Sequence, residues 1–418
     1  MKIRVLMVVA LGCALCGCPI GGGTTYTVGG TVTGLLGSGL VLEINGGDNL
    51  AFSANGGFDF GTRLANGAAY SVTVATQPTN PAQTCTARNA SGSINKGDIT
   101  NVIVSCTQTG HRVRLPIGGS PFAVNGAAPT ALTIDPNGQF LFVANNGSNT
   151  VSIFSIDVTT GVLTEVGLPV ATGNGPGALV VDPTDHYLYV ANLTDNTLSA
   201  YTLDNGNLTQ ITGFPVTVGN EPVSLAIDPN GNFLYATNFT GSNVTVFLID
   251  LSNGMLSNVS GSPFGAGAGP LSIAIDPTGA FAFVANEAAN SLSAYSLNAT
   301  NGSLTAVAGS PFPAVTNPES LVVDPAGRYV FAANAEAADQ VATYSITPSS
   351  GALTLLSTAP AGSLPVGIAI DPSGQFLYAV NFNSNDVSAY TVAPSGALTA
   401  VPGSPFAAGG QPHAIAID

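Results

Sequence analysis

The sequence predicts an all-β protein built from a repeated unit, and three observations carry this prediction. An aspartate recurs every 46 to 48 residues, at Asp135, Asp182, Asp228, Asp276, Asp324, Asp371 and Asp418. A proline stands six positions before each of them, at Pro129, Pro176, Pro222, Pro270, Pro318, Pro365 and Pro412. Four β-rich runs, separated by turn residues, fall within each full unit. A period of ~40–50 residues with four strands per unit is typical of a β-propeller, in which each repeat forms one blade.

The first 18 residues predict a lipoprotein signal peptide. Lys2 and Arg4 precede a short apolar run that ends in Leu15-Cys16-Gly17-Cys18, which resembles the bacterial lipobox. Cys18 is the expected lipidation site because Leu15 stands three positions before it. The alternative is an ordinary secretory signal with cleavage nearby. Either interpretation predicts an exported protein, and the first predicts a protein anchored in the bacterial cell envelope that touches the membrane only through its lipid.

Residues 19–25 form a Gly-rich tether, and residues 26–107 predict a small β-sandwich. About seven short alternating runs are separated there by Gly-rich and Asn-rich turns. The runs are Thr27–Thr33, Gly39–Ile44, Leu50–Ser53, Phe58–Phe60, Tyr70–Ala75, Thr84–Arg88 and Ile99–Cys106. If Cys18 is acylated, Cys85 and Cys106 are the cysteines left in the mature chain, and in an oxidising compartment we expect them to form a disulfide.

Residues 111–418 predict the β-propeller. One unit shows the pattern: Ser272–Ile275 is an inner strand, Phe281–Ala285 an aromatic-rich second strand, Leu292–Leu297 a third, and Gly302–Thr305 begins the fourth. The Asp-Pro-x-Gly motif between the first two strands predicts a tight turn, in which the aspartate side chain accepts hydrogen bonds from the nearby backbone. This role explains the recurring aspartates without a metal. The asparagine at the end of each second strand is likewise interpreted as a turn cap that bonds to nearby backbone.

The repeats do not divide evenly between the two ends of the chain. Pro412–Ile417 supplies a seventh inner strand, but there are six second and six third strands. A fourth-strand signal precedes the first repeat, where Arg112–Ile117 leads into Gly119–Phe122. The sequence thus predicts seven blades, the last one incomplete, closed by pairing strands from both termini. Six full blades with spare terminal strands is the alternative.

Charge excludes several functions. Charged residues make up 7% of the chain, the net charge is −15, and from Leu115 onward Arg328 is the only Lys or Arg. A nucleic-acid or phosphate groove needs several cationic side chains. Nucleic acid is therefore excluded as a partner, and so is electrostatic binding to anionic lipid.

From Arg112 to Asp418, the repeat, its period and the final inner strand resemble the seven-bladed lactonase-type propellers, which include 6-phosphogluconolactonase-like members. The resemblance implies the seven-bladed fold. It also implies that enzymatic members carry Gly-Pro-Arg-His at the start of one inner strand, Asn-Glu in the next loop between a second and a third strand, and a His at the start of the preceding blade. This chain has Gly269-Pro270-Leu271-Ser272, Asn286-Glu287 and Val223 in those places. Glu287 matches the pattern, whereas the Arg and both His are replaced.

The candidate site residues lie in loops expected to share one face of the ring. Glu221, Glu319 and His413 stand beside the loop prolines, and Glu287 and Glu336 lie in loops between second and third strands. Together they could form an acidic funnel that holds a divalent cation or a neutral polar ligand. The alternative is a set of separate solvent-facing side chains. The sequence implies no cofactor and no dedicated metal site.

We interpret the chain as a monomeric cell-envelope lipoprotein whose propeller is a non-catalytic binding module for a protein or glycan partner. The alternative is an enzyme, a lactone hydrolase with a rebuilt site around Glu287. The replaced Arg and His favour the first interpretation, since nothing obvious would clamp an anionic substrate or transfer a proton.

Overall fold

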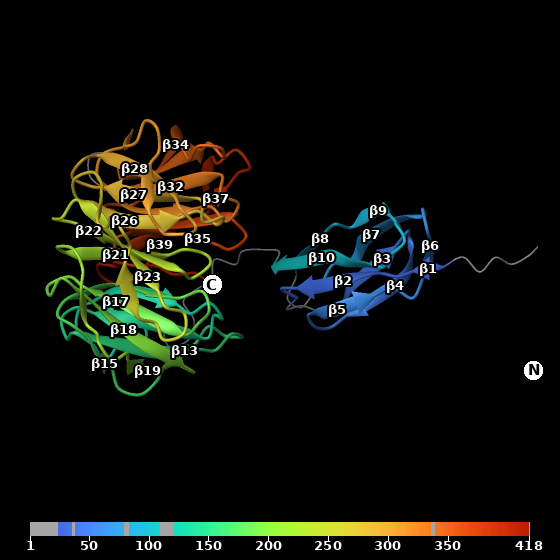
Figure 1. Ribbon diagram of the computed structural model, residues 1–418, viewed down its shortest axis with the longest axis horizontal. Helices are drawn as coiled ribbons and strands as arrows, with labels where there is room; N and C mark the ends of the chain where they lie inside the picture. The colour runs from blue at the N-terminus through green and yellow to red at the C-terminus, as the bar shows by residue number, and fades with distance from the viewer. Residues whose placement is uncertain (1–23, 36–37, 79–82, 109–119, 336–338, 418) are drawn as a thin grey trace, which may run out of the picture. The chain divides into compact units, whose positions relative to one another are not determined.

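The computed structural model describes residues 24–35, 38–78, 83–108, 120–335 and 339–417. The chain divides into two compact units, Met1–Leu115 and Pro116–Asp418, which are considered separately. The described residues are all-β (Figure 1). Within these ranges, the structure contains no helix with the length and apolarity needed to cross a membrane.

The N-terminal unit is a β-sandwich of two four-stranded sheets. One sheet has the order β5 (Gly56–Asp59), β2 (Val28–Thr33), β10 (Ile99–Gln108), β8 (Gln83–Arg88). The other has the order β4 (Gly47–Phe52), β3 (Leu40–Ile44), β7 (Ala69–Thr76), β9 (Ser91–Ser93), and a small sheet pairs β1 (Thr25–Tyr26) with β6 (Leu64–Ala65). Alternating side chains of these strands, such as Val32, Leu42 and Val104, form one buried core.

All seven runs expected in this unit correspond to strands, and three short strands (β1, β6 and β9) are added to them. The sequence does not predict that the first and last long strands of this unit pair with each other. β2 and β10 lie parallel, with Val32 opposite Val104, so strands far apart in the chain share one sheet.

The expected disulfide is present. Cys85 and Cys106 stand opposite each other in the antiparallel ladder of β8 and β10, with a Cα–Cα distance of 3.9 Å. Both side chains are buried in the core of the sandwich. The bond closes a loop with a sequence separation of 21 residues.

Replacing Cys85 and Cys106 together by alanine is expected to lower the free energy of unfolding by ~3 kcal/mol, because the unfolded chain regains the entropy that the closed loop removes. Urea unfolding followed by circular dichroism measures the change. Reductant should shift the wild-type transition to that of the variant and leave the variant unchanged. An identical midpoint for both proteins under oxidising conditions would contradict the prediction.

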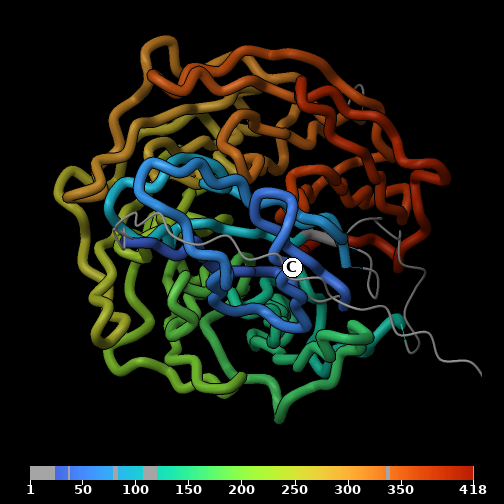
Figure 2. The backbone as a smooth tube through the Cα atoms, turned by 90° about the vertical axis from the view of Figure 1, so that its right-hand side faces the viewer, coloured from blue at the N-terminus to red at the C-terminus, as the bar shows by residue number. Residues whose placement is uncertain are grey.

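The C-terminal unit contains six similar antiparallel sheets, called blades 1 to 6 in chain order (Figure 2). The inner strands are β11 (Pro129–Ile134), β16 (Pro176–Val181), β21 (Pro222–Ile227), β26 (Pro270–Ile275), β31 (Pro318–Val323) and β35 (Pro365–Ile370). The second strands are β12 (Phe140–Asn145), β17 (Tyr187–Asn192), β22 (Phe233–Asn238), β27 (Phe281–Asn286), β32 (Tyr329–Asn334) and β36 (Phe376–Asn381).

Two outer rows of strands complete each blade. The third strands are β13 (Thr150–Ile156), β18 (Thr197–Asp204), β23 (Asn243–Ile249), β28 (Ser291–Leu297), β33 (Gln340–Ile346) and β37 (Asp386–Val392). The fourth strands are β14 (Leu163–Glu165), β19 (Asn207–Gln210), β24 (Leu256–Asn258), β29 (Leu304–Ala306), β34 (Leu353–Pro360) and β38 (Leu398–Ala400). In every blade but blade 5, a two-residue strand also pairs with the third strand: β15 (Val170–Ala171), β20 (Val216–Thr217), β25 (Phe264–Gly265), β30 (Phe312–Pro313) and β39 (Phe406–Ala407).

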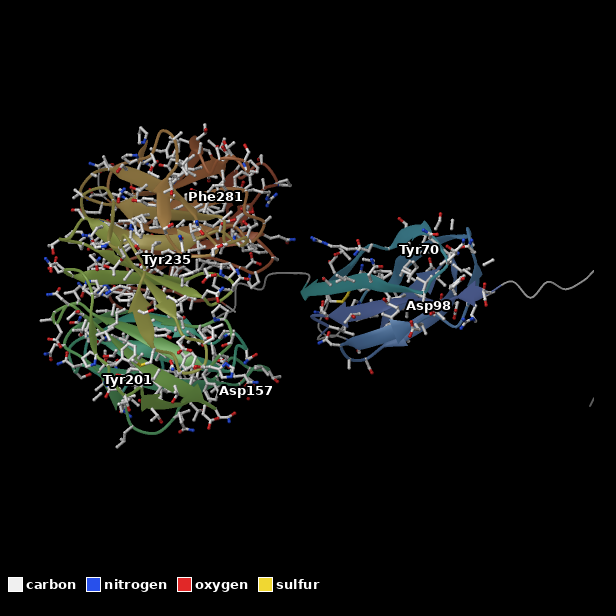
Figure 3. All side chains as sticks on the ribbon, viewed as in Figure 1. Tyr70, Asp98, Asp157, Tyr201, Tyr235 and Phe281 are labelled. Atoms are coloured by element: carbon white, nitrogen blue, oxygen red, sulfur yellow. A yellow bond between two sulfur atoms is a disulfide. The ribbon has the colours of Figure 1, made fainter. Side chains whose placement is uncertain are left out.

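The apolar cores of the propeller lie between blades. The core between blades 3 and 4, for example, contains Tyr235 and Val246 from one blade and Val284 and Tyr295 from the next. The Tyr235 side chain, labelled in Figure 3, lies among the propeller strands. It is 1% exposed. A single four-stranded sheet therefore buries its faces only when its neighbours are present, which is why the repeat implies a closed array of blades.

The Asp-Pro-x-Gly turns have the predicted structure. The Asp135 Oδ1 atom accepts hydrogen bonds from the backbone N–H groups of Gln139 and Phe140, at 2.7 and 2.5 Å. The aspartate side chains of the six described turns are buried, and each accepts such bonds from its own turn. These contacts account for the recurring aspartates as turn formers.

Blade 2 departs from this turn at its fourth position. Asp185 stands where the other turns have glycine and adopts a left-handed φ of 62°. Its Oδ2 accepts a hydrogen bond of 2.6 Å from Asn137 Nδ2 in blade 1, while its Oδ1 is buried without a partner. Burial, together with the neighbouring charges of Asp135 and Asp182, raises the pKa of Asp185.

Replacing Asp185 by glycine is expected to stabilise the protein by about 1 kcal/mol near neutral pH, because a buried carboxylate oxygen without a partner is removed. The raised pKa means that the folded protein holds this proton more tightly than the unfolded chain. Stability that the protonated form contributes is therefore lost as pH rises through the raised pKa. The difference between variant and wild type should shrink in acid, as measured by thermal unfolding across a pH series.

Asp185→Asn separates charge from backbone strain, since it keeps the side-chain size. The stability difference between Asp185→Asn and wild type should show most of the pH dependence that is expected for Asp185→Gly. A constant difference between wild type and both variants at every pH would contradict the assigned cause.

The seventh inner segment, Pro412–Ile417, occupies the next position but is not a strand, which corrects the prediction. A Cβ on Gly367 in β35 would lie 3.1 Å from the His413 carbonyl oxygen, so the segment runs against the inner strand of blade 6. Among the described residues, no second strand pairs with it. Its expected partner, Arg112–Ile117, lies outside the described residues.

Local geometry nevertheless marks Pro412–Ile417 as the start of another blade. Gln411 has a φ of 50°, and its N–H donates to Asn385 Oδ1 at 2.6 Å. The residue before the inner strand of blade 3, Glu221, has a φ of 53° and donates to Asn196 Oδ1 at 2.7 Å. The same conformation thus recurs at a seventh position.

Candidate functional site

The loops that precede the inner strands (D–A loops) and those between second and third strands (B–C loops) are joined by a repeated hydrogen bond. The residue before each inner-strand proline has a left-handed conformation, and its carbonyl accepts the N–H of the first B–C residue. The Glu221 carbonyl accepts from Phe239 at 2.8 Å, and the Gly269 carbonyl accepts from Glu287 at 2.8 Å. The side of the propeller that carries these loops is called the loop face.

Glu287 is the first residue of the B–C loop in blade 4, and its side chain is partly buried. Its backbone position is held by the bond to Gly269. A Cβ on Gly269 would lie 2.9 Å from the Ala288 Cβ and 3.1 Å from the Phe239 ring, and Gly269 has a φ of 65°. A side chain is therefore excluded there, and the backbone beneath Glu287 packs closely against blade 3.

Glu221 combines a site position with a structural role. Its N–H and carbonyl link blade 2, through Asn196, to the B–C loop of its own blade, through Phe239. The side chain is partly buried. Since the backbone of Glu221 carries these contacts, its side chain remains the part of the residue that a ligand could use.

Glu319 and His413 occupy the same place in their repeats, directly after the loop proline. Glu319 lies in β31 and is partly buried, whereas His413 is exposed. The His413 ring packs edge-on against the Phe382 ring, with centroids 4.8 Å apart. The equivalent residues in the other repeats are Thr130, Gly177, Val223, Leu271 and Val366.

Glu336, the remaining predicted site residue, lies outside the described residues. The others come from separate blades. Within the described ranges, no three His, Cys, Asp or Glu side chains come close enough to hold a metal ion. The predicted acidic funnel thus consists of carboxylates distributed around the loop face rather than a preformed cation site.

Arg328 is placed away from the loop face. It follows the Asp-Pro-x-Gly turn of blade 5, at the opposite end of the strands. Its Nε donates to Asp324 Oδ2 at 3.0 Å, and its guanidinium lies 5.1 Å from the centre of the Tyr329 ring. Since no other Lys or Arg occurs after Leu115, none of the loop-face residues that the structure describes is a Lys or Arg.

Two recurring sets of residues make contacts that the sequence analysis did not predict: the asparagines that end the second strands, and an Asn or Asp at the end of most B–C loops. The strand-end asparagines are buried. Five of the six donate to side-chain oxygens; Asn286 Nδ2, for example, donates to Ser291 Oγ and Ser293 Oγ at 3.1 and 2.9 Å. Their assignment as backbone-bonding turn caps is wrong for these five, whereas Asn334 does bond to backbone, at the carbonyls of Ala332 and Gln340. A second set at the ends of the B–C loops was missed, although its regular spacing was a usable signal: Asn149, Asn196, Asn290, Asp339 and Asn385, each of which accepts an N–H from the next blade.

Solved structures with the same fold come from several bacteria. A 6-phosphogluconolactonase candidate from Bacteroides uniformis ATCC 8492 has 22% identity and a TM-score of 0.62, covering 70% of this chain and 88% of its own. A second candidate of this kind, from Bacteroides fragilis NCTC 9343, has 21% identity and a TM-score of 0.63, covering 70% and 87%. The periplasmic gluconolactonase of Pseudomonas aeruginosa has 20% identity and a TM-score of 0.60, covering 68% and 86%.

No curated protein matches the chain significantly in sequence. The family model described as lactonase, 7-bladed beta-propeller, matches residues 120–175, 168–265 and 259–415. These ranges run through all six described blades and include the segment at the seventh inner position. The chain therefore belongs to the lactonase family of seven-bladed β-propellers.

Proposed function

We propose that the propeller hydrolyses an uncharged lactone at its loop face, with Glu287 as the general base. Membership of the lactonase family supports the reaction class, and the similar structures include a gluconolactonase. The observation that carries the assignment to Glu287 is its partly buried carboxylate at the first B–C position of blade 4, on a backbone held by Gly269. The proposal therefore favours the enzyme over the non-catalytic binding module that the sequence alone favoured.

The proposed step needs one carboxylate and one water molecule. Glu287 accepts a proton from water as the water oxygen attacks the lactone carbonyl carbon. The ring C–O bond then breaks, and the proton passes to the leaving alkoxide, so that one water is added and a hydroxy acid is released. No metal or cofactor is required by this balance.

Electrostatics argue for an uncharged substrate. The loop face lacks Lys and Arg, and the chain has a net charge of −15. A phosphorylated lactone would be repelled by the protein's field and would find no cationic partner. Wild-type protein should therefore accelerate loss of glucono-lactone above the spontaneous rate and have no detectable effect on 6-phosphogluconolactone. Saturable turnover of the phosphorylated substrate alone would overturn this choice of substrate.

A non-catalytic module that binds a protein or glycan partner is the second candidate. It is favoured by Val223, Leu271 and Ser272, which stand where the enzymatic relatives are expected to carry His, Arg and His. Absence of turnover with a panel of neutral lactones, together with saturable binding of a glycan at the loop face, would establish it instead.

We also propose that the protein is exported and anchored through Cys18. The Cys85–Cys106 disulfide supports an oxidising compartment. Cys18→Ser should leave an unprocessed precursor or release the protein from membranes, as shown by mass spectrometry of its N-terminus and by fractionation. Normal processing of that variant would contradict the assignment.

A further inference from the structure

A cavity of 290 Å³ lies between blades 5 and 6, among their outer strands. It is separate from Glu287, which belongs to blade 4. Its walls come from the end of β34 and from β37, β38 and the segment after β38. The lining residues are Ala359, Pro360, Ala361, Ser388, Tyr390, Leu398, Ala400, Ser404 and Pro405.

The equivalent space between other blades is filled by side chains of the preceding blade. In blade 4, Phe312 pairs with Leu292 and packs in the core between blades 4 and 5, together with Val307. In blade 3, Phe264 and Val259 do the same between blades 3 and 4. Both phenylalanines end a Gly-Ser-Pro-Phe tetrapeptide that interrupts the fourth strand.

Blade 5 lacks this tetrapeptide, and its fourth strand β34 runs without interruption. Ala359 pairs with Val341, the register that Phe312 and Leu292 have in blade 4. Ala359 follows Leu353 by six positions, whereas Phe312 follows Leu304 by eight. A methyl group therefore stands where the neighbouring blades place a phenyl ring, and this substitution opens the cavity.

The apolar side chains that could have filled the space point elsewhere. Leu355 and Leu356 of β34 are 48% and 47% exposed, whereas Val307 in blade 4 is 7% exposed. Blade 5 thus leaves the cavity open although it carries large apolar residues nearby in sequence.

The chemistry of the walls selects an uncharged ligand. No charged residue lines the cavity. Its hydroxyl groups already have partners: Tyr390 donates to the Pro360 carbonyl at 2.6 Å, Ser388 Oγ accepts from Gly362 N–H at 3.0 Å, and Ser404 Oγ accepts from Ala389 N–H at 2.9 Å. Methyl groups, Leu398 and the Tyr390 ring make up the rest, and an aromatic ring would gain both apolar burial and a ring–ring contact there.

We propose that this cavity is a binding site for a small uncharged aromatic molecule of one or two rings, which takes the place that a phenylalanine holds in blades 3, 4 and 6. Enclosed apolar cavities bind benzene-like ligands; here Pro360, Ala400 and Pro405 are exposed, so the cavity also opens to solvent. The volume stands at the lower end of the ~300–1,000 Å³ that is usual for small-molecule sites, which limits the ligand to this size class.

Indole is a suitable probe because the chain contains no tryptophan. Its fluorescence can be followed against tyrosine emission alone. Wild-type protein should give a saturable blue shift of indole emission. Indole-3-acetate should bind at least about tenfold more weakly, since its carboxylate would be desolvated without a partner.

Ala359→Phe introduces the ring that blades 3, 4 and 6 carry at this position and should abolish the shift while raising the melting temperature. Ala306→Phe is the matched control: it adds the same ring at an exposed fourth-strand position of blade 4 and should leave indole binding unchanged. If Ala359→Phe does not fold, Ala400→Phe, on the opposite wall, should also block the site. No saturable shift in wild type, or a shift that survives filling of the cavity, would overturn the proposal.

Discussion

Replacing Glu287 by glutamine is expected to lower kcat for glucono-lactone by ~10²–10⁴-fold, the usual contribution of a general base. Glutamine keeps the size and hydrogen-bonding reach of glutamate but cannot accept the proton from water. The backbone bond of residue 287 to Gly269 does not involve the side chain, so the fold of the loop should persist. Initial rates with wild type and variant, corrected for spontaneous hydrolysis, measure the effect.

Glu165→Gln is the matched control for this experiment. Glu165 lies in the outer strand β14 of blade 1, in a different blade from Glu287, and its carboxylate accepts a hydrogen bond from Asn125. It should leave kcat unchanged. Equal rates for wild type and Glu287→Gln would show that another group supplies the base, and with no turnover in either protein the binding-module candidate would stand.

Replacing Gly302 by alanine is expected to lower the free energy of unfolding of the propeller by about 3 kcal/mol, through a left-handed backbone and overpacking. Gly302 has a φ of 72°, and a Cβ there would lie 2.4 Å from the Phe233 ring of blade 3. Its carbonyl also accepts a hydrogen bond from the Tyr235 hydroxyl at 3.3 Å. The new methyl group would therefore push two blades apart.

Gly167→Ala separates the two causes. Gly167 has a φ of 68°, but a Cβ there meets no atom within 4 Å, so that variant should lose only about 1 kcal/mol from backbone conformation. Urea unfolding followed by far-UV circular dichroism gives both values. If the two variants unfold at the same urea concentration, contact with Phe233 does not contribute as proposed.

Gly302 has a packing role that its sequence motif alone does not reveal. The recurring Gly-x-Leu-Thr motif indicates the start of a fourth strand. The structure shows that this glycine also packs on the aromatic residue that begins the second strand of the preceding blade, as Gly351 does on Phe281. In each case, two signals about 70 residues apart in the chain form one contact between blades. No local window of sequence contains both.

The sequence predicts which loops the candidate site residues occupy. It does not predict the backbone contacts that hold each of them. Loop position alone placed Glu287 and Glu221 on one face, because D–A and B–C loops meet there in every blade. It did not distinguish Glu221, whose backbone links two blades, from Glu287, whose backbone is held by a single D–A contact. That distinction depends on hydrogen bonds between residues 18 to 25 positions apart.

The amino-acid sequence by itself determined the blade period, the turn chemistry, the sandwich strands and the disulfide pair. Each of these depends on local propensity, on spacing along the chain or, for the two cysteines, on counting. Only the tertiary structure decided that Pro412–Ile417 lies against β35 without forming a strand, and that Ala359 opens a cavity. Both depend on which neighbour supplies the facing side chains or the pairing strand, and blades bury their faces only against one another.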